Sequence, residues 1–240
     1  IAGQGADTVT TGSGSDTVLG DNGEISYGLN SVTIQSTATD QGGDDSITAL
    51  GGDNTVVGGF GSDAITSGSG NDVILGDNGE LSYVDGDLTN AVSTSATLGG
   101  TDTIAVGEGD NIVIAGQGAD VVTTGSGSDT VMGDNGEISY DLDGVTIQST
   151  ATDQGGDDSI TALGGDNTVV GGFGGDTITT ANGNDDILGD NGVIEYGNVV
   201  RLSSDDEEAG TTGIDIITAG AGDNRILAGL SNDDVTTLGG

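Results

Sequence analysis

The chain has 240 residues, of which 49 are Gly and 40 are Asp or Glu, whereas Lys and Arg together number 2 and His, Cys, Pro and Trp do not occur. This inventory excludes nucleic acid as a partner, because binding a polyanion requires Lys and Arg. It also excludes a thick hydrophobic core, since aromatic residues make up only 2% of the chain. We expect no membrane insertion, because no apolar run reaches the roughly 20 residues of a spanning helix. The formal net charge of −38 needs counter-charge that the chain itself lacks, and multivalent cations are the obvious source.

The acidic residues recur at a fixed spacing, which a disordered acidic tail has no reason to show. The unit is Gly-x-Gly-x-Asp-x-U-x-x, in which U is aliphatic, as in residues 3–11 and 12–20. Its fifth position recurs every nine residues within a block. The seventeen fifth positions are Asp7, Asp16, Asp45, Asn54, Asp63, Asp72, Asp102, Asn111, Asp120, Asp129, Asp158, Asn167, Asp176, Asp185, Asp215, Asn224 and Asp233.

Longer periods lie above the nonapeptide. Four nonapeptides form a block, and each full block is followed by about twenty residues that open with Gly-Asp-Asn-Gly, so the block period is 56 or 57 residues. Residues 1–66 recur at 114–179 with seven differences, which indicates a recent duplication. We expect one continuous array over residues 1–240, a fragment of a longer repeat protein, with blocks at about 1–40, 41–97, 98–153, 154–210 and 211–240.

Each nonapeptide divides into a Gly-rich half that must turn and a short half that can extend. In the extended half only the U residue faces inward, as the two-residue period of a strand requires. The pattern predicts an all-β fold, a parallel β-roll or β-solenoid in which two nonapeptides form one flattened coil with strands on opposite sheets. The expected inward residues include Val9, Val18, Ile47, Val56, Ile65, Ile74, Ile104, Ile160 and Ile178.

The two sheets of such a coil differ on the outside. First and third nonapeptides flank the core residue with small polar groups, whereas second and fourth nonapeptides often add a second, outward aliphatic. This apolar stripe favours a cover, either another chain or displaced loops, although scattered surface aliphatics are the alternative. The outward aliphatics are Leu19, Val57, Leu75, Ile114, Met132 and Leu188.

The block-ending segments alternate like strands, first over residues 20–27 and again over 32–36. They form either an irregular third coil or a β-hairpin leaning on the roll. We favour the third coil slightly, because it leaves no sheet edge open in mid-array. In that coil the matching tyrosines, Tyr27, Tyr83, Tyr140 and Tyr196, would serve as plugs, and Asp21, Asp77, Asp134 and Asp190 could complete cation sites left half-built by the preceding turns.

The nonapeptide resembles the RTX (repeats-in-toxin, haemolysin-type) repeat, and the long array is similar to those of giant secreted bacterial surface proteins and adhesins. The resemblance implies that several calcium ions are held between the turns of neighbouring coils by the fifth-position Asp side chains and by turn carbonyls. Calcium prefers such hard oxygens. The Asn units, each preceded by Asp, are either weaker sites assisted by that Asp or turn formers without metal.

An enzyme is not expected, because a chain without His, Cys or Lys lacks the usual general bases and a catalytic triad. The leading hypothesis is a structural segment of a secreted adhesin, fibre, surface or matrix protein, exported unfolded by a type I system and folding on external calcium, as the resemblance implies.

Alternatives are the secretion and folding module of a toxin or hydrolase and, with less support, an ice-binding solenoid, whose outward Thr ranks are interrupted at Ala64, Ala105, Val121 and Ile216. The expected location is extracellular or at the cell surface. Calcium ions are the expected partners, and lateral or end-to-end association between copies is a further expectation.

Overall fold

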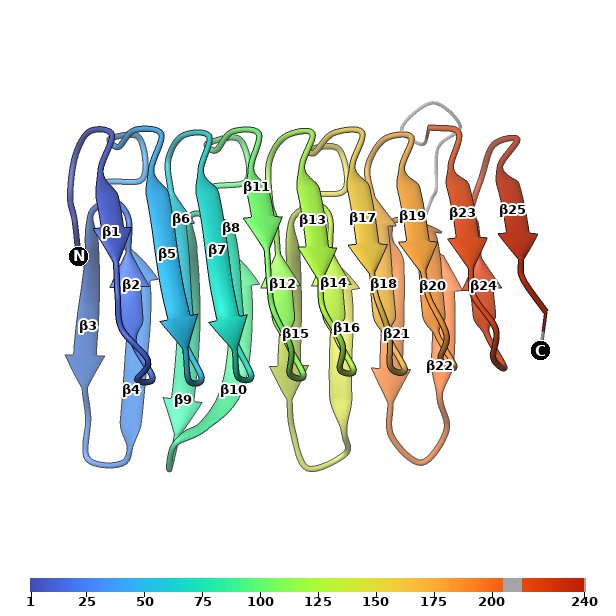
Figure 1. Cartoon of the computed structure of the whole chain (residues 1–240), viewed down its shortest axis with the longest axis horizontal. Coiled ribbons are helices and arrows are strands. Elements are labelled where there is room, and N and C mark those ends of the chain that lie inside the picture. Colours follow the sequence, from blue (N-terminus) through green and yellow to red (C-terminus); the bar gives the residue numbers. More distant parts are fainter. Residues whose placement is uncertain (205–212, 240) are drawn as a thin grey trace.

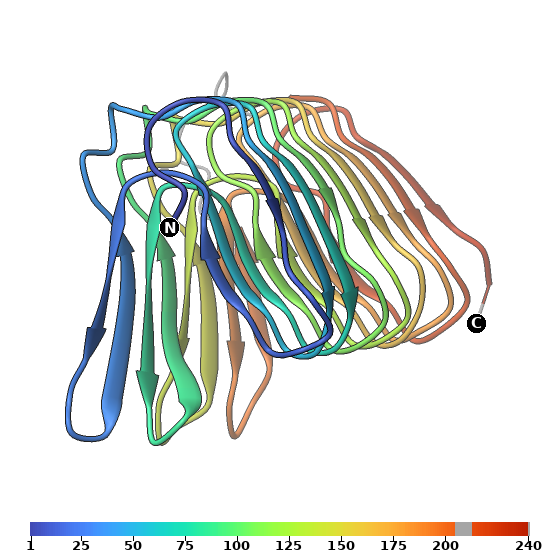
Figure 2. The ribbon, with the colours of Figure 1, turned by 60° about the vertical axis from the view of Figure 1, so that its left-hand side comes forward.

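The fold is a stack of flattened β-coils with a layer of hairpins beside it (Figures 1 and 2). The computed structural model describes residues 1–204 and 213–239, and over those ranges it contains 25 strands and no helix. Within the same ranges, nothing could therefore cross a membrane as a helix. The strands form three sheets that extend along one long axis, and the all-β prediction with parallel, stacked coils is confirmed.

Sheet A contains nine parallel strands and faces the viewer in Figure 1. Equivalent repeat positions stand opposite one another, so that Ile47 pairs with Ile65 and Ile65 with Ile104. Each strand begins just after a fifth-position residue. In sheet order the strands are β1 (Thr8–Thr10), β5 (Ser46–Gly51), β7 (Ala64–Ser69), β11 (Thr103–Ala105), β13 (Val121–Thr124), β17 (Ser159–Ala162), β19 (Thr177–Thr180), β23 (Ile216–Ala219) and β25 (Asp234–Thr237).

Sheet B contains eight parallel strands and supplies the other half of each coil. It is apolar on both faces, as parallel sheets covered on both sides are: Val56 and Val57, which point to opposite faces, are both at most 1% exposed. In sheet order its strands are β2 (Thr17–Leu19), β6 (Thr55–Gly59), β8 (Val73–Asp77), β12 (Ile112–Ile114), β14 (Thr130–Met132), β18 (Thr168–Gly172), β20 (Asp186–Asp190) and β24 (Arg225–Leu227).

A thin core of one aliphatic per strand lies between sheets A and B, as expected. Val9 at the end of the array is only partly buried, whereas the other predicted inward residues are at most 4% exposed. The small residues Ala49, Ala115 and Ala219 complete this core. The predicted set that the structure buries is Val18, Ile47, Val56, Ile65, Ile74, Ile104, Ile160 and Ile178.

The block-ending segments form β-hairpins, and the preference for a third coil was wrong. The hairpins pair with one another into sheet C, an antiparallel sheet of eight strands, so no edge is left open between blocks. A third coil was favoured because it would leave no sheet edge open, and the pairing between hairpins achieves the same result. The hairpins are β3 (Gly23–Tyr27) with β4 (Ser31–Ser36), β9 (Gly79–Val84) with β10 (Asp87–Ser93), β15 (Gly136–Tyr140) with β16 (Val145–Ser149), and β21 (Gly192–Tyr196) with β22 (Arg201–Ser204).

A second core explains why hairpins are preferred. The outward aliphatics of sheet B pack against the apolar face of sheet C, where residues such as Leu81 and Ile138 are fully buried. The outward aliphatic residues of sheet B, which were expected to need a cover, are thus covered by hairpins of the same chain. A third coil would have left it in water, at a cost of about 25 cal/mol for each Å² of apolar surface.

The two layers fit because their repeats match. Each block adds two strands to sheet B, such as β6 and β8, and one hairpin adds two strands to sheet C, such as β9 and β10. Neighbouring strands lie about 4.8 Å apart in both sheets. Sheets B and C therefore lengthen by the same distance per block, and their strands stay matched along the array.

The tyrosines have a different place from the one expected. They lie on the hairpins rather than inside a coil, so they plug nothing. Tyr83 and Tyr196 reach sheet B, where their hydroxyls lie 2.9 Å from the Oγ1 of Thr55 and 2.7 Å from that of Thr168. Tyr27 is 78% exposed.

Candidate metal-binding turns

The turns that join the sheets carry the fifth-position residues on two edges of the stack. We call those that lead into sheet A the B-to-A turns and those that lead into sheet B the A-to-B turns. Because equivalent positions stack in register, each edge gathers its fifth positions into one row. The B-to-A row contains Asp7, Asp45, Asp63, Asp102, Asp120, Asp158, Asp176, Asp215 and Asp233, and the A-to-B row contains Asp16, Asn54, Asp72, Asn111, Asp129, Asn167, Asp185 and Asn224.

Beyond the first coil, which holds Asp7 and Asp16, one oxygen of each of these side chains accepts a hydrogen bond from the preceding coil. The backbone N–H of Asp45 donates to Oδ1 of Asp63 at 2.7 Å, and that of Asp63 donates to Oδ1 of Asp102 at 2.7 Å. The same bond recurs along both rows, for example from Asn111 to Asp129 at 2.9 Å. The fifth position therefore links each coil to the next, which an unbound side chain in a simple Asx-turn would not do.

The second oxygen lacks a partner. In eleven of these carboxylates Oδ2 is buried and makes no hydrogen bond within the protein. Burying an uncompensated carboxylate costs several kcal/mol, and the chain offers only two basic side chains to compensate them. The eleven are Asp7, Asp16, Asp45, Asp63, Asp72, Asp102, Asp120, Asp129, Asp158, Asp176 and Asp185.

The pKa values record this cost. Burial raises the pKa of Asp63 and of Asp120 to about 7 and that of Asp176 to about 8. Burial and then the neighbouring Asp77 raise the pKa of Asp102 to about 10. Without added positive charge, burial therefore favours the protonated form of these carboxyls.

Glycines let carbonyl oxygens approach the same carboxylates. A Cβ on Gly58 would collide with Oδ2 of Asp63 and with the backbone oxygen of Gly76 in the next coil. The equivalent Gly171 faces Asp176 in the same way. Carboxylate and carbonyl oxygens from adjacent coils thus border one small space, and both are ligands that calcium prefers.

The four Gly-Asp-Asn-Gly aspartates adjoin the B-to-A row. Asp77 accepts hydrogen bonds from the backbone of Gln117 at 2.5 Å and of Gly100 at 3.1 Å, so it ties the start of a hairpin to its return and to the next coil. Asp21 accepts from Phe60 at 2.6 Å, Asp134 accepts from Phe173, and Asp190 accepts from Leu230 at 2.7 Å. Burial raises the pKa of Asp77 and Asp134 to about 9. Their carboxylates lie beside the turns, and much of their bonding capacity is used by backbone amides. That they complete cation sites stays a prediction.

The aspartates that precede the Asn units do not converge on the Asn side chains. Asp53 accepts from the backbone of Asn71 at 2.8 Å, and Asp110 accepts from that of Ser128 at 2.8 Å, both at the exposed surface. They hold the outer turn of the next coil, so the idea that they assist a metal site receives no support from the geometry.

No group of three or more His, Cys, Asp or Glu side chains that could hold a metal occurs among residues 1–204 and 213–239. A cation here would depend on one or two carboxylates and on backbone oxygens, which suits calcium, a hard cation with six to eight oxygen ligands. The donor set and the partnerless Oδ2 atoms together fit that ion.

Two sets of residues escaped the sequence reasoning. Hydroxyls at Thr11, Ser67, Thr124 and Thr180 are buried without a hydrogen-bond partner, five residues before an A-to-B aspartate in each case. A search for positions that covary with the Asp and Asn alternation would have found them. The Asn of each Gly-Asp-Asn-Gly sequence was also overlooked: Asn78 donates to the backbone of Thr39 and of Leu98 at 3.2 Å, joining two hairpin returns.

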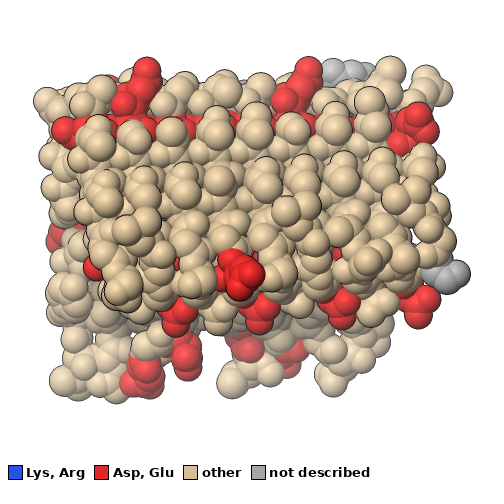
Figure 3. Space-filling model, in the orientation of Figure 1, with Lys and Arg blue, Asp and Glu red and all other residues tan. Residues whose placement is uncertain are grey.

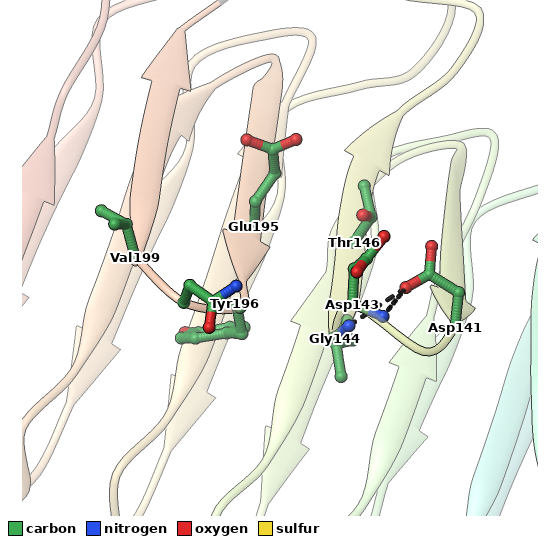
Figure 4. Close-up of a pocket in the computed structure, with 10 residues that line it drawn as sticks. Asp141, Asp143, Gly144, Thr146, Glu195, Tyr196 and Val199 are labelled. Atoms are coloured by element: carbon green, nitrogen blue, oxygen red, sulfur yellow. Dashed lines mark hydrogen bonds between the residues drawn. The ribbon is translucent and has the colours of Figure 1, made fainter.

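The tips of two hairpins enclose a shallow groove of about 330 Å³ (Figure 4). Asp141 turns toward its own loop and accepts from the backbone of Asp143 at 2.7 Å and of Gly144 at 3.0 Å. Tyr196 and Glu195 form the opposite wall. The Asp141 carboxylate is engaged in its local turn, and nothing in this groove resembles the recurrent turns described above.

Comparison with known families agrees with these turns. The model of the RTX calcium-binding nonapeptide repeat, in four copies, matches residues 1–24, 39–74, 97–136, 150–178, 161–193 and 209–240, more than half of the chain. The chain belongs to this family and is a calcium-binding RTX repeat segment. The unmatched stretches fall largely on the hairpins. Searches of curated proteins and of solved structures each gave no match.

Proposed function

We propose that this chain is a structural segment of a large secreted bacterial protein, such as an adhesin, fibre, surface or matrix component, that becomes a stiff rod when it binds calcium. The observation that carries this proposal is the unbroken register of three sheets along one axis. Successive coils repeat the same contacts, which suits a spacer. The proposal gives the chain no catalytic role.

The ligands in this proposal are the fifth-position aspartates of both rows together with turn carbonyls. Bound calcium neutralises the partnerless carboxylates and joins consecutive coils. The buried aspartates Asp21, Asp77, Asp134 and Asp190 shape the turns beside these ions. Folding and ion binding are then one process, as in other small-core metal-dependent folds.

Export follows from the same charge. A chain with net charge −38 repels itself and stays extended in the absence of a divalent ion. RTX repeats are typical of proteins secreted by type I systems, which pass unfolded chains. We therefore propose that this segment folds outside the cell, at extracellular calcium concentrations.

Small-angle scattering tests the rod. A second copy of residues 1–113 can be fused to the N-terminus of the full chain without a new junction, because residues 1–66 recur at 114–179. This fusion adds four coils, and the rod in calcium should lengthen by about 19 Å. A compact particle whose length does not follow the number of coils would contradict the proposal.

A second candidate, ice binding, is favoured by the outer face of sheet A. One outward column carries Thr in every strand except β11, which has Ala105, and a band without charged side chains crosses this face between acidic side chains above and below it (Figure 3). The interruptions at Ala64, Val121 and Ile216 all fall in the neighbouring column. Regular hydroxyls on a flat face can order water. Thermal hysteresis of the calcium-loaded chain that is lost in Thr123→Lys would support this role, and freezing at the buffer's own point would end it. The column is Thr10, Thr48, Thr66, Ala105, Thr123, Thr161, Thr179, Thr218 and Thr236.

A further inference from the structure

The A-to-B turns are of two chemical kinds that alternate along the stack. Asp and Asn take turns at the fifth position, and the residue five positions earlier changes with them in all eight turns. Asp turns have a hydroxyl there and Asn turns have an aliphatic. The pairs are Thr11 with Asp16, Ser67 with Asp72, Thr124 with Asp129 and Thr180 with Asp185, against Ala49 with Asn54, Val106 with Asn111, Ala162 with Asn167 and Ala219 with Asn224.

The Asp turns contain polar atoms without partners. Oδ2 of the aspartate and Oγ of the residue five positions earlier are both buried, and neither has a partner within the protein in hydrogen-bonding geometry. In the interior of the array these residues are almost inaccessible: Asp129 is 1% exposed and Thr124 is 0% exposed. Leaving two buried oxygens unpaired at one turn costs a few kcal/mol, and the same pair recurs at all four Asp turns.

The hydroxyl and the carboxylate of an Asp turn share one space. Burial raises the pKa of Asp129, and the neighbouring Thr124 hydroxyl lowers it in part. A cation between these two groups would accept electron density from both oxygens at once. Thr124 and Asp129 are therefore close neighbours, although their side chains do not meet in hydrogen-bonding geometry.

The Asn turns use every polar atom of the Asn side chain. Oδ1 of Asn111 accepts from the backbone of Asp72 at 3.0 Å. Its Nδ2 donates to the backbone oxygen of Gly109 at 2.8 Å and to Oδ1 of Asp129 at 2.9 Å. Asn54 repeats this arrangement with Gly52 at 2.8 Å and Asp72 at 2.9 Å.

The Asn amide therefore donates to the two kinds of oxygen, a turn carbonyl and a carboxylate, that would otherwise require a cation. Ala49, Val106 and Ala219 belong to the core between sheets A and B, and Ala162 is fully buried, so apolar side chains complete these turns. Asn turns are closed by the protein alone, whereas Asp turns lack a positive group.

We propose that calcium occupies only alternate turns on this edge: the four Asp turns bind it through carboxylate, hydroxyl and backbone oxygens, and the four Asn turns bind none. This inference rests on the calcium binding assigned to the chain above. It gives the hydroxyls a role as ligands and the Asn amides a role as internal substitutes for the ion.

The test compares ion counts in variants of the full chain at saturating calcium, measured by elemental analysis after equilibrium dialysis. Thr124→Val with Asp129→Asn should lower the count by one ion and keep the β-sheet spectrum, because it converts an Asp turn into an Asn turn. The reverse change, Val106→Thr with Asn111→Asp, should raise the count by one. Asn111→Ala should leave the count unchanged, although it loosens the turn.

Two results would overturn the inference: loss of an ion in Asn111→Ala, or an unchanged count in both converted chains. Should one converted chain fail to fold, the other still decides, because gain and loss are measured on different turns. A wild-type chain that binds no calcium would instead refute the proposed function. The two failures are therefore distinguishable.

Discussion

Sheet B is joined to its two neighbouring sheets by different means. On the side of sheet C, aliphatic residues of the strands meet aliphatic residues of the hairpins, and the chain supplies both partners. At the turns that join sheets A and B, carboxylates are buried against backbone with no positive side chain to meet them. The hairpin layer is therefore stabilised by the protein itself, whereas the coil turns depend on what the solvent provides.

The largest effect should come from removing calcium. Chelation removes the cation from the eleven partnerless carboxylates. Keeping them buried then requires either an uncompensated charge or a bound proton, so at pH 8 the coils should unfold and the hairpins should lose their support. Far-ultraviolet circular dichroism should change from β-structure in millimolar calcium, the range of extracellular modules, to coil in chelator. Identical spectra in both conditions would show that the turns do not need the ion.

Acid should partly restore the calcium-free fold. The folded pKa values of Asp63, Asp120 and Asp176, about 7, 7 and 8, lie above the unfolded value of 3.8. Their contribution to folding is fully present below about pH 4 and is lost as pH rises through 7 to 8. Calcium-depleted protein should therefore show more β-structure at pH 4 than at pH 8. The opposite order would contradict the assigned burial.

Leu75→Ala tests the apolar contact between sheet B and the hairpin layer. Leu75 is 1% exposed between sheets B and C, so its truncation should cost about 2 to 5 kcal/mol. Thermal unfolding in calcium measures the loss, and the number of bound ions should stay the same. Leu50→Ala, at a side chain 58% exposed, is the matched control and should change stability by under about 0.5 kcal/mol.

Asp102→Ala tests the dependence of the turns on calcium. It removes a ligand, so the calcium midpoint should rise by roughly threefold to tenfold, about 0.7 to 1.4 kcal/mol. In calcium-depleted protein at pH 4, where part of the β-structure should persist, the same change should have a smaller effect, because no bound ion is lost there. Asp87→Ala, on an exposed hairpin tip, should leave the calcium midpoint unchanged. Destabilisation by Asp102→Ala that is equal with and without calcium would assign the carboxylate a purely structural role.

Tyr83→Phe should give the smallest effect. It removes the hydroxyl contact with Thr55 that joins hairpin to sheet B, at a cost of about 1 kcal/mol. Tyr27→Phe, at an exposed position, provides the comparison. Equal melting temperatures for the two variants would show that this polar contact contributes nothing to the layer.

The coil could be predicted from the sequence because a nine-residue period with one aliphatic fixes both turn and strand. The hairpin layer could not be chosen over a third coil, since the deciding contact joins segments a full block apart. Ile34 on one hairpin pairs with Leu81 on the next, a relation that no single segment reveals. The outward aliphatic residues of sheet B were the sequence signal for the hairpin layer, because a row of apolar side chains needs other apolar residues to cover it.

The sequence was enough to identify the fifth-position residues as a row. It was not enough to predict the different roles of the two oxygens of each carboxylate. That Oδ1 links coils while Oδ2 stays without a partner depends on the register between coils, which only the assembled sheets define. The sequence contains Thr124, but it does not reveal that the Thr124 hydroxyl is buried beside Asp129. That proximity depends on how the turn between them folds.

A crystal structure of the chain grown in calcium, with anomalous scattering to locate the ions, tests the central claim most directly. The account predicts peaks about 2.3 to 2.6 Å from Oδ2 of the buried aspartates, including Asp63, Asp120 and Asp176. Ions bound only at exposed carboxylates such as Asp44 and Asp53, with the buried Oδ2 atoms left apart from any peak, would contradict it.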